Sequence, residues 1–137
     1  MTIKRPRATG HYARYHGREY HATIGDGTSV ILRSYRGEPP AEGFRPSRIP
    51  SVQSILPVER FELDELTFVR TVCRWQGEPF TVVGVDEQTL YVFYTGNRGE
   101  WMAHQPGMVR TGKLETHGSL HISQVTDVFE LVNPPLP

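Results

Sequence analysis

An internal repeat restricts the fold of this chain more than any other feature, because two copies of one pattern predict two similar units. Residues 14–22 align without a gap on residues 74–82, at a constant offset of 60 residues. The shared pattern is Arg-aromatic-x-Gly-x-x-aromatic, and it continues to an aspartate in each copy, Asp26 and Asp86. A chain of 137 residues has room for two units of this size in tandem.

Each copy predicts three short antiparallel strands. The glycine of the shared pattern permits a tight turn, and the following aromatic residue begins a second strand. Asp26-Gly27 is a strong hairpin signal and leads to a third strand over residues 29–35, matched by residues 89–95 in the second copy. Both third strands are rich in β-branched and aromatic residues, which favour a half-buried strand.

The expected fold class is mainly β, with two tandem small antiparallel units, each an SH3-like barrel or a bent sheet with a short helical turn. The first unit is expected over residues 1–66, with a Pro/Gly-rich loop at 36–50. The second is expected over residues 67–137, with an equivalent loop at 96–107. Glycine and proline dominate both loops, as is typical of irregular connections.

Two segments predict the helical turns that close the units, one over residues 56–66 and the other over residues 122–131. A late hairpin is expected from residues 107–111 and 114–116. Phe61 and Leu66 are expected to plug the first unit, and Val125 and Phe129 are expected to share one face of the second helical turn.

Charge is unevenly distributed along a chain whose formal net charge is zero. Residues 1–50 carry nine Lys/Arg against four Asp/Glu, a net charge of +5, and residues 51–137 carry six against eleven, a net charge of −5. This asymmetry suits either internal complementarity or two different partner faces. No run approaches the roughly 20 apolar residues that cross a bilayer, and the N-terminus lacks a signal-like apolar segment, so we expect a cytoplasmic protein without membrane contact.

Residues that could carry chemistry do not form a catalytic or metal-binding pattern. Five of the six histidines fall in two groups whose spacing suits neither a metal site nor one helix face: His11, His16 and His21, then His117 and His121. Nucleophile elbows, phosphate loops and dinucleotide fingerprints are absent from the sequence. We therefore expect no enzyme activity, no metal and no cofactor. The single cysteine, Cys73, lies in an apolar run and is expected to be a buried structural thiol.

Nucleic-acid binding by the basic first half is the alternative function. Its arginines could contact phosphates while Tyr12, Tyr15 and Tyr20 stack on bases. The neutral net charge and the acidic second half argue against it, because dedicated nucleic-acid binders are usually basic.

Three further segments resemble a group of small bacterial proteins, the immunity proteins encoded beside polymorphic toxins. In residues 58–66 an acidic Leu-Asp stretch leads to the strand and turn of residues 69–80, and residues 90–96 end in Tyr-Thr-Gly. The similarity covers most of residues 12–131, and its motifs are structural, so it transfers no binding residues. The resemblance implies a cytoplasmic protein that binds one cognate toxin and blocks it by occlusion.

Candidate partner-binding residues lie on the two loops and on the acidic stretch. Loop aromatic residues and arginines are typical interface anchors, and carboxylates could engage a basic toxin cleft. The candidates on the loops are Phe44, Arg45, Arg48, Trp101, Met102 and His104. The candidates on the acidic stretch are Glu59, Glu62, Asp64 and Glu65. For Trp101 a lid over the second core and a partner anchor both remain open.

Overall fold

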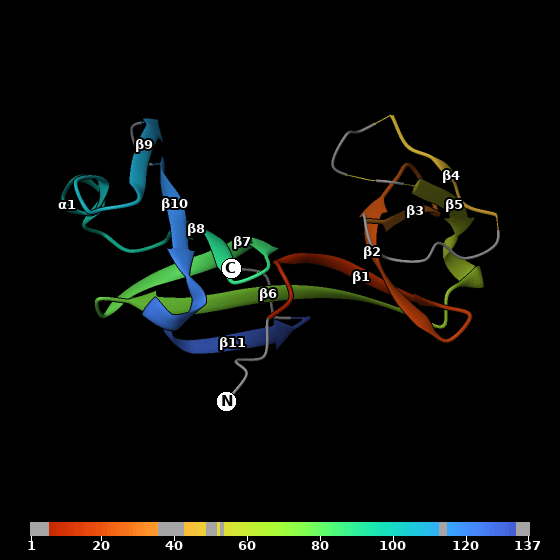
Figure 1. Ribbon diagram of the computed structural model, residues 1–137. Helices are drawn as coiled ribbons and strands as arrows, with labels where there is room; N and C mark the ends of the chain where they lie inside the picture. The colour runs from red at the N-terminus through yellow and green to blue at the C-terminus, as the bar shows by residue number, and fades with distance from the viewer. Residues whose placement is uncertain (1–5, 36–42, 49–51, 53, 113–114, 134–137) are drawn as a thin grey trace. The chain divides into compact units, whose positions relative to one another are not determined.

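The computed structural model describes residues 6–35, 43–48, 52, 54–112 and 115–133, and most of them lie in antiparallel strands (Figure 1). The mainly β prediction is confirmed. The chain divides into two compact units, which we call the first unit (Gly10–Phe68) and the second unit (Met1–Thr9 with Val69–Pro137).

The first unit holds the strands up to the start of β6. Its elements are β1 (Gly10–Tyr15), β2 (Arg18–Ile24), β3 (Ser29–Ser34), β4 (Arg45–Pro46), β5 (Ser54–Glu59) and the 3₁₀ turn η1 (Arg60–Glu62), followed by the first residues of β6 (Glu65–Trp75). Their hydrogen-bonded order is β4-β5-β3-β2-β1-β6. Much of the Pro/Gly-rich loop at 36–50 lies outside the described residues.

The second unit continues from β6 to the end of the described chain. Its elements are the remainder of β6, β7 (Glu78–Asp86), β8 (Thr89–Tyr94), the helix α1 (Gly99–Ala103), β9 (Met108–Gly112), β10 (Glu115–His121), the 3₁₀ turn η2 (Ile122–Gln124) and β11 (Thr126–Val132). Within it the order is β11-β6-β7-β8-β10-β9. The strands β9 and β10 form the late hairpin that the sequence predicts, and α1 lies beside them (Figure 1).

The repeated Arg-aromatic-x-Gly pattern forms the same hairpin turn in both units. Its two central residues have left-handed backbone conformations: His16 (φ 49°), Gly17 (φ 80°), Gln76 (φ 52°) and Gly77 (φ 76°). Two successive left-handed residues suit the right-handed twist of the flanking strands, and the second is the position where glycine is easiest to accommodate. The repeated arginines donate to the turn carbonyls, Arg14 Nη1 to Gly17 O at 3.4 Å and Arg74 Nη1 to Gly77 O at 3.1 Å.

The strand register also repeats at the offset of 60 residues. The equivalent cross-strand pairs are Ala13 with Tyr20 and Cys73 with Phe80, then Ala22 with Leu32 and Val82 with Val92. All eight side chains are buried, in one core cluster per unit. The register repeats because each inward-facing residue must fill the equivalent place in the core of its own unit.

The two helical segments are shorter than the sequence predicts. Only η1 and η2 are helical, and extended strands flank each turn. Phe61 is 83% exposed, so the prediction that it plugs the first unit is wrong, whereas Leu66 packs against the first core as expected. Val125 is buried in the second core while Phe129 is 58% exposed on β11, so the prediction that these two share a helical face is wrong.

Within the described ranges, no helix is both long and apolar enough to span a bilayer.

Candidate functional site

The short helix α1 is held against the second unit by both of its ends. Met102 is fully buried in the second core. Thr116 on β10 donates its hydroxyl to the carbonyl oxygen of Gly99 at 3.3 Å. The backbone N–H of Arg98 donates to the Tyr94 hydroxyl at 2.9 Å. The segment that carries the exposed side chains is therefore fixed before any partner binds.

The Tyr94 hydroxyl connects this segment to a carboxylate on β7. It donates to Glu78 Oε1 at 2.6 Å while accepting from Arg98. Desolvation raises the pKa of Tyr94, and the hydrogen bond to Glu78 raises it further, because both favour the protonated phenol. The hydroxyl therefore keeps its proton and serves as a fixed support.

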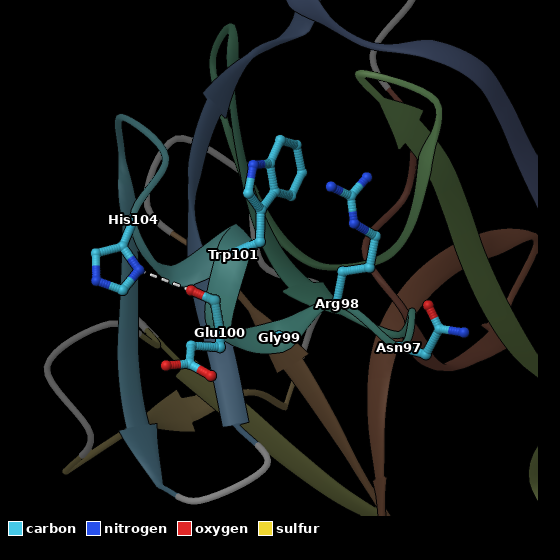
Figure 2. A pocket seen from close by; sticks show the side chains of 6 residues that line it. All are labelled: Asn97, Arg98, Gly99, Glu100, Trp101 and His104. Atoms are coloured by element: carbon cyan, nitrogen blue, oxygen red, sulfur yellow. Dashed lines mark hydrogen bonds between the residues drawn. The ribbon is translucent and has the colours of Figure 1, made fainter.

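Arg98 and Trp101 form the centre of the site (Figure 2). The guanidinium carbon of Arg98 lies 4.1 Å from the centroid of the Trp101 ring, within the range of a cation–π contact. The indole remains 37% exposed. The two residues border an open hollow of about 470 Å³, which we call the Trp101 hollow; it is lined by Asn97, Arg98, Gly99, Glu100, Trp101 and His104.

His104 has its tautomer set by the same segment. Its Nδ1 lies 2.7 Å from the carbonyl oxygen of Glu100, and since a carbonyl can only accept, Nδ1 carries the proton (Figure 2). In the neutral ring Nε2 is therefore an acceptor. The Trp101 hollow thus offers a cation, an exposed indole and acceptors from Glu100 and His104, which suits a mixed polar and aromatic partner surface.

The structure places the partner-binding candidates of the second loop in different surroundings, some exposed and one buried. The structure brings Trp101 and His104 together in one hollow. Met102 is fully buried, so its assignment to a partner-binding surface is wrong. The reason is the helix, which the sequence does not predict: neighbouring helical residues point about 100° apart, so Trp101 and Met102 cannot face the same way.

Arg98 is the residue that the sequence reasoning missed. It lies three residues before Trp101, a spacing that places two side chains on one face of a helical turn. That spacing could have predicted the contact between Arg98 and Trp101. It was not recognised because Gly96 and Gly99 make residues 96–107 resemble an irregular loop.

The first-loop candidates are in the other unit. Phe44 is half-buried, with its ring centroid 5.2 Å from that of Tyr20 and its side chain packed against the first core. Arg45 and Arg48 are exposed. Phe44 is therefore largely a core residue, while the two arginines remain accessible.

The acidic candidates are exposed but partly engaged within the first unit. Glu59 accepts from the Thr28 hydroxyl, and Glu62 accepts from the backbone N–H of Glu59 at 2.7 Å across η1. Glu65 lies 3.9 Å from Arg14. Asp64 is exposed, and its backbone N–H donates to Arg14 O at 2.8 Å. The three glutamates thus make contacts within the first unit, and all four acidic side chains are exposed.

Two of the three tyrosines in the nucleic-acid alternative have little accessible ring surface. Tyr12 and Tyr20 are buried. Tyr15 stacks on the His16 ring, with centroids 4.0 Å apart. Base stacking on Tyr12 and Tyr20 would require both rings to leave the folded unit.

Two observations concern the side chains that could bind a metal or act as a nucleophile. In the part of the chain that the structure describes, no three His, Cys, Asp or Glu side chains gather as metal ligands. Cys73 is buried, as predicted, and desolvation raises the pKa of its thiol from 9.0 to about 11. At neutral pH this thiol is protonated and poorly nucleophilic.

The family model described as uncharacterised conserved protein UCP033725 matches residues 8–135. No curated protein and no solved structure matches the chain. The match spans both units and includes the Trp101 hollow, so the chain belongs to this family of uncharacterised conserved proteins.

Proposed function

We propose that this protein is an immunity-type inhibitor, which binds one cognate bacterial toxin domain and blocks it by stoichiometric occlusion. The observation that carries the proposal is the exposed Trp101 ring under the Arg98 guanidinium, on a helix anchored by Met102. Tryptophan and arginine dominate the binding free energy of many protein interfaces.

Preorganisation favours binding over catalysis at this place. Arg98 already stacks on Trp101, and the Tyr94 and Thr116 hydroxyls hold the backbone on either side. A partner therefore does not have to order these groups, which lowers the entropic cost of association. The hollow is open and bordered by fixed hydrogen bonds, which suits a protein surface.

The toxin class of partner is supported by the resemblance of residues 58–66, 69–80 and 90–96 to immunity proteins. The SH3-like form of the units is part of the same proposal. In each unit a 3₁₀ turn precedes the last strand, and that strand lies beside the first strand of the same unit. Small bent sheets of this kind present loops from a rigid support.

The test is co-expression with the product of the adjacent gene, followed by calorimetric titration of the purified pair. We expect a one-to-one complex, and we expect Trp101→Ala to weaken it by about 30-fold, the effect of losing a contact worth about 2 kcal/mol. Phe61→Ala is the matched control, because it removes a more exposed ring from the other unit. Failure of the adjacent product to bind contradicts the toxin assignment; an unchanged affinity of Trp101→Ala contradicts the anchor.

A further inference from the structure

β11 exposes apolar side chains at the edge of the second unit. In the described part of the chain it hydrogen-bonds to β6 along one side only. Phe129 is 58% exposed, Leu131 42% and Val132 53%. An edge strand carries unpaired backbone N–H and C=O groups that another strand can bind.

These side chains continue a band that crosses the whole second unit. Register pairs connect one residue from each of six strands, and we call this set the outer row: Phe129, Val72, Thr81, Phe93, His117 and Val109. Their neighbours along the strands, such as Cys73, Phe80 and Val92, belong to the second core. Since successive side chains alternate between faces, the outer row lies on the face turned away from that core.

The first unit carries charged residues at the equivalent positions. Its corresponding row, connected by register pairs and by the Thr67 contact to Tyr12, is Thr67, Tyr12, His21, Arg33, Ile55 and Arg45. This row has two arginines, whereas the outer row has no Asp, Glu, Lys or Arg. The uncharged band is thus specific to the second unit.

The other edge strands are poorly suited to pairing. β4 is two residues long and ends in Pro46. β9 has five residues, contains Arg110 and ends in Gly112. Short strands, proline and charge are the usual protection of sheet edges. β11 has seven residues with a register shift between Thr126 and Phe129, and its last four residues pair with β6 in regular register and contain no proline, lysine or glycine.

The charges of β11 are already compensated within the chain. Glu130 lies 3.1 Å from Arg7, and Asp127 lies 4.0 Å from Arg74. A charged partner such as nucleic acid therefore gains little from this edge, whereas an apolar strand whose own charges are already paired, as those of β11 are, brings no unpaired charge to it.

We propose that the occupant of this edge is β11 of a second copy of the chain, paired antiparallel about a two-fold axis. Paired residues of antiparallel strands share a face, so Phe129 and Leu131 of both copies would lie together on the outer side and extend the outer row. Each Glu130 arrives with its own Arg7, which reduces repulsion across the axis. A single strand pair buries less than a standard interface of about 1,600 Å², so the dimer is weak, with a dissociation constant in the micromolar range.

Sedimentation velocity of the full chain over a wide concentration range tests this proposal. We expect a reversible monomer–dimer equilibrium for the wild type, and at least a 10-fold weaker equilibrium for Phe129→Lys and for Leu131→Lys. Val109→Lys is the matched control, since Val109 is 53% exposed at the opposite end of the outer row, and it should dimerise normally. Circular dichroism shows whether each variant folds. Where one β11 variant fails to fold, the dimerisation of the other β11 variant tests the proposal.

Hydrogen exchange locates the contact independently of the substitutions. The amides of β11 should gain protection as concentration rises, while those of β9 should not. A wild type that stays monomeric at the highest concentration overturns the proposal, as does a dimer whose added protection lies on β9. Neither result tests binding at the Trp101 hollow, so the dimer can be rejected without rejecting the proposed function.

Discussion

The hydroxyl of Tyr94 shows how one buried polar group connects the second core to the segment that carries Arg98 and Trp101. It lies in the second core, donates to Glu78 on β7 and accepts from the backbone of Arg98 at the start of α1. Without it the Arg98 N–H would lose its partner in a part-buried place, which destabilises a fold. The positions of Arg98 and Trp101 therefore depend on a residue that contacts no partner.

Replacing that hydroxyl should be measurable in the free energy of unfolding. We expect Tyr94→Phe to destabilise the protein by about 1–3 kcal/mol, the cost of a lost buried hydrogen bond, in a urea titration. Tyr91→Phe is the control, because Tyr91 is 44% exposed on the neighbouring outward position of β8 and should change stability little. Equal effects of the two substitutions would contradict the supporting role of Tyr94.

The burial of Cys73 predicts how the stability of the protein depends on pH. Burial raises the pKa of its thiol from 9.0 to about 11, so between these values the folded state holds a proton that the unfolded state releases. The stability that the folded state gains by keeping the Cys73 thiol protonated is therefore complete below pH 9 and is lost as the pH rises toward 11. Denaturant titrations from pH 8 to pH 10 should show stability falling more for the wild type than for Cys73→Ser. An identical pH dependence of both proteins would contradict the burial of the thiol.

Among the elements, the hairpins and the presence of a short helical turn in each unit were predictable, but the bounds of those turns were not. A glycine after an Arg-aromatic pair specifies a turn locally, which is why β1–β2 and β6–β7 followed from the repeat. In the segment 56–66 apolar residues recur at helix-like intervals, but the chain is a strand, a 3₁₀ corner and another strand. That corner exists because the sheet must bend, and the bend depends on tertiary packing that no local pattern encodes.

The close approach of β9 and β10 is a property of this pair of strands. A Cβ at Gly118 would collide with the carbonyl oxygen of Gly107 and lie 2.8 Å from Met108 Sδ. Both strands would have to separate to admit it, and Met108 is buried in the second core.

We expect Gly118→Ala to lower the free energy of unfolding by roughly 2 kcal/mol or more, through overpacking. Gly99→Ala is the matched control, because its nearest contact would be Thr116 Oγ1 at 3.8 Å and its backbone conformation suits alanine. Thermal denaturation of both variants provides the measurement. A Gly118→Ala protein as stable as Gly99→Ala would show that the strands are less closely packed than described.

For the whole molecule, the repeat describes the structure that the two units share, and the differences between the copies describe the surfaces that we propose bind partners. Turns, register and core positions recur in both units, while the Trp101 hollow and the outer row belong to the second unit alone. The sequence predicted the general β architecture, because a repeated turn is a local signal, and the partner-binding role of Trp101 stays a prediction. It could not predict the Arg98 contact or the burial of Met102, since both follow from a helix that depends on packing against β10.

The most direct test of the proposed inhibitor function is a titration of the isotope-labelled protein with the product of the adjacent gene, followed by nuclear magnetic resonance. We expect saturation at one equivalent, with the largest chemical-shift changes at the Trp101 indole N–H and at the backbone amides of residues 97–104. Changes confined to other residues, with the Trp101 signal unmoved at saturation, would contradict it.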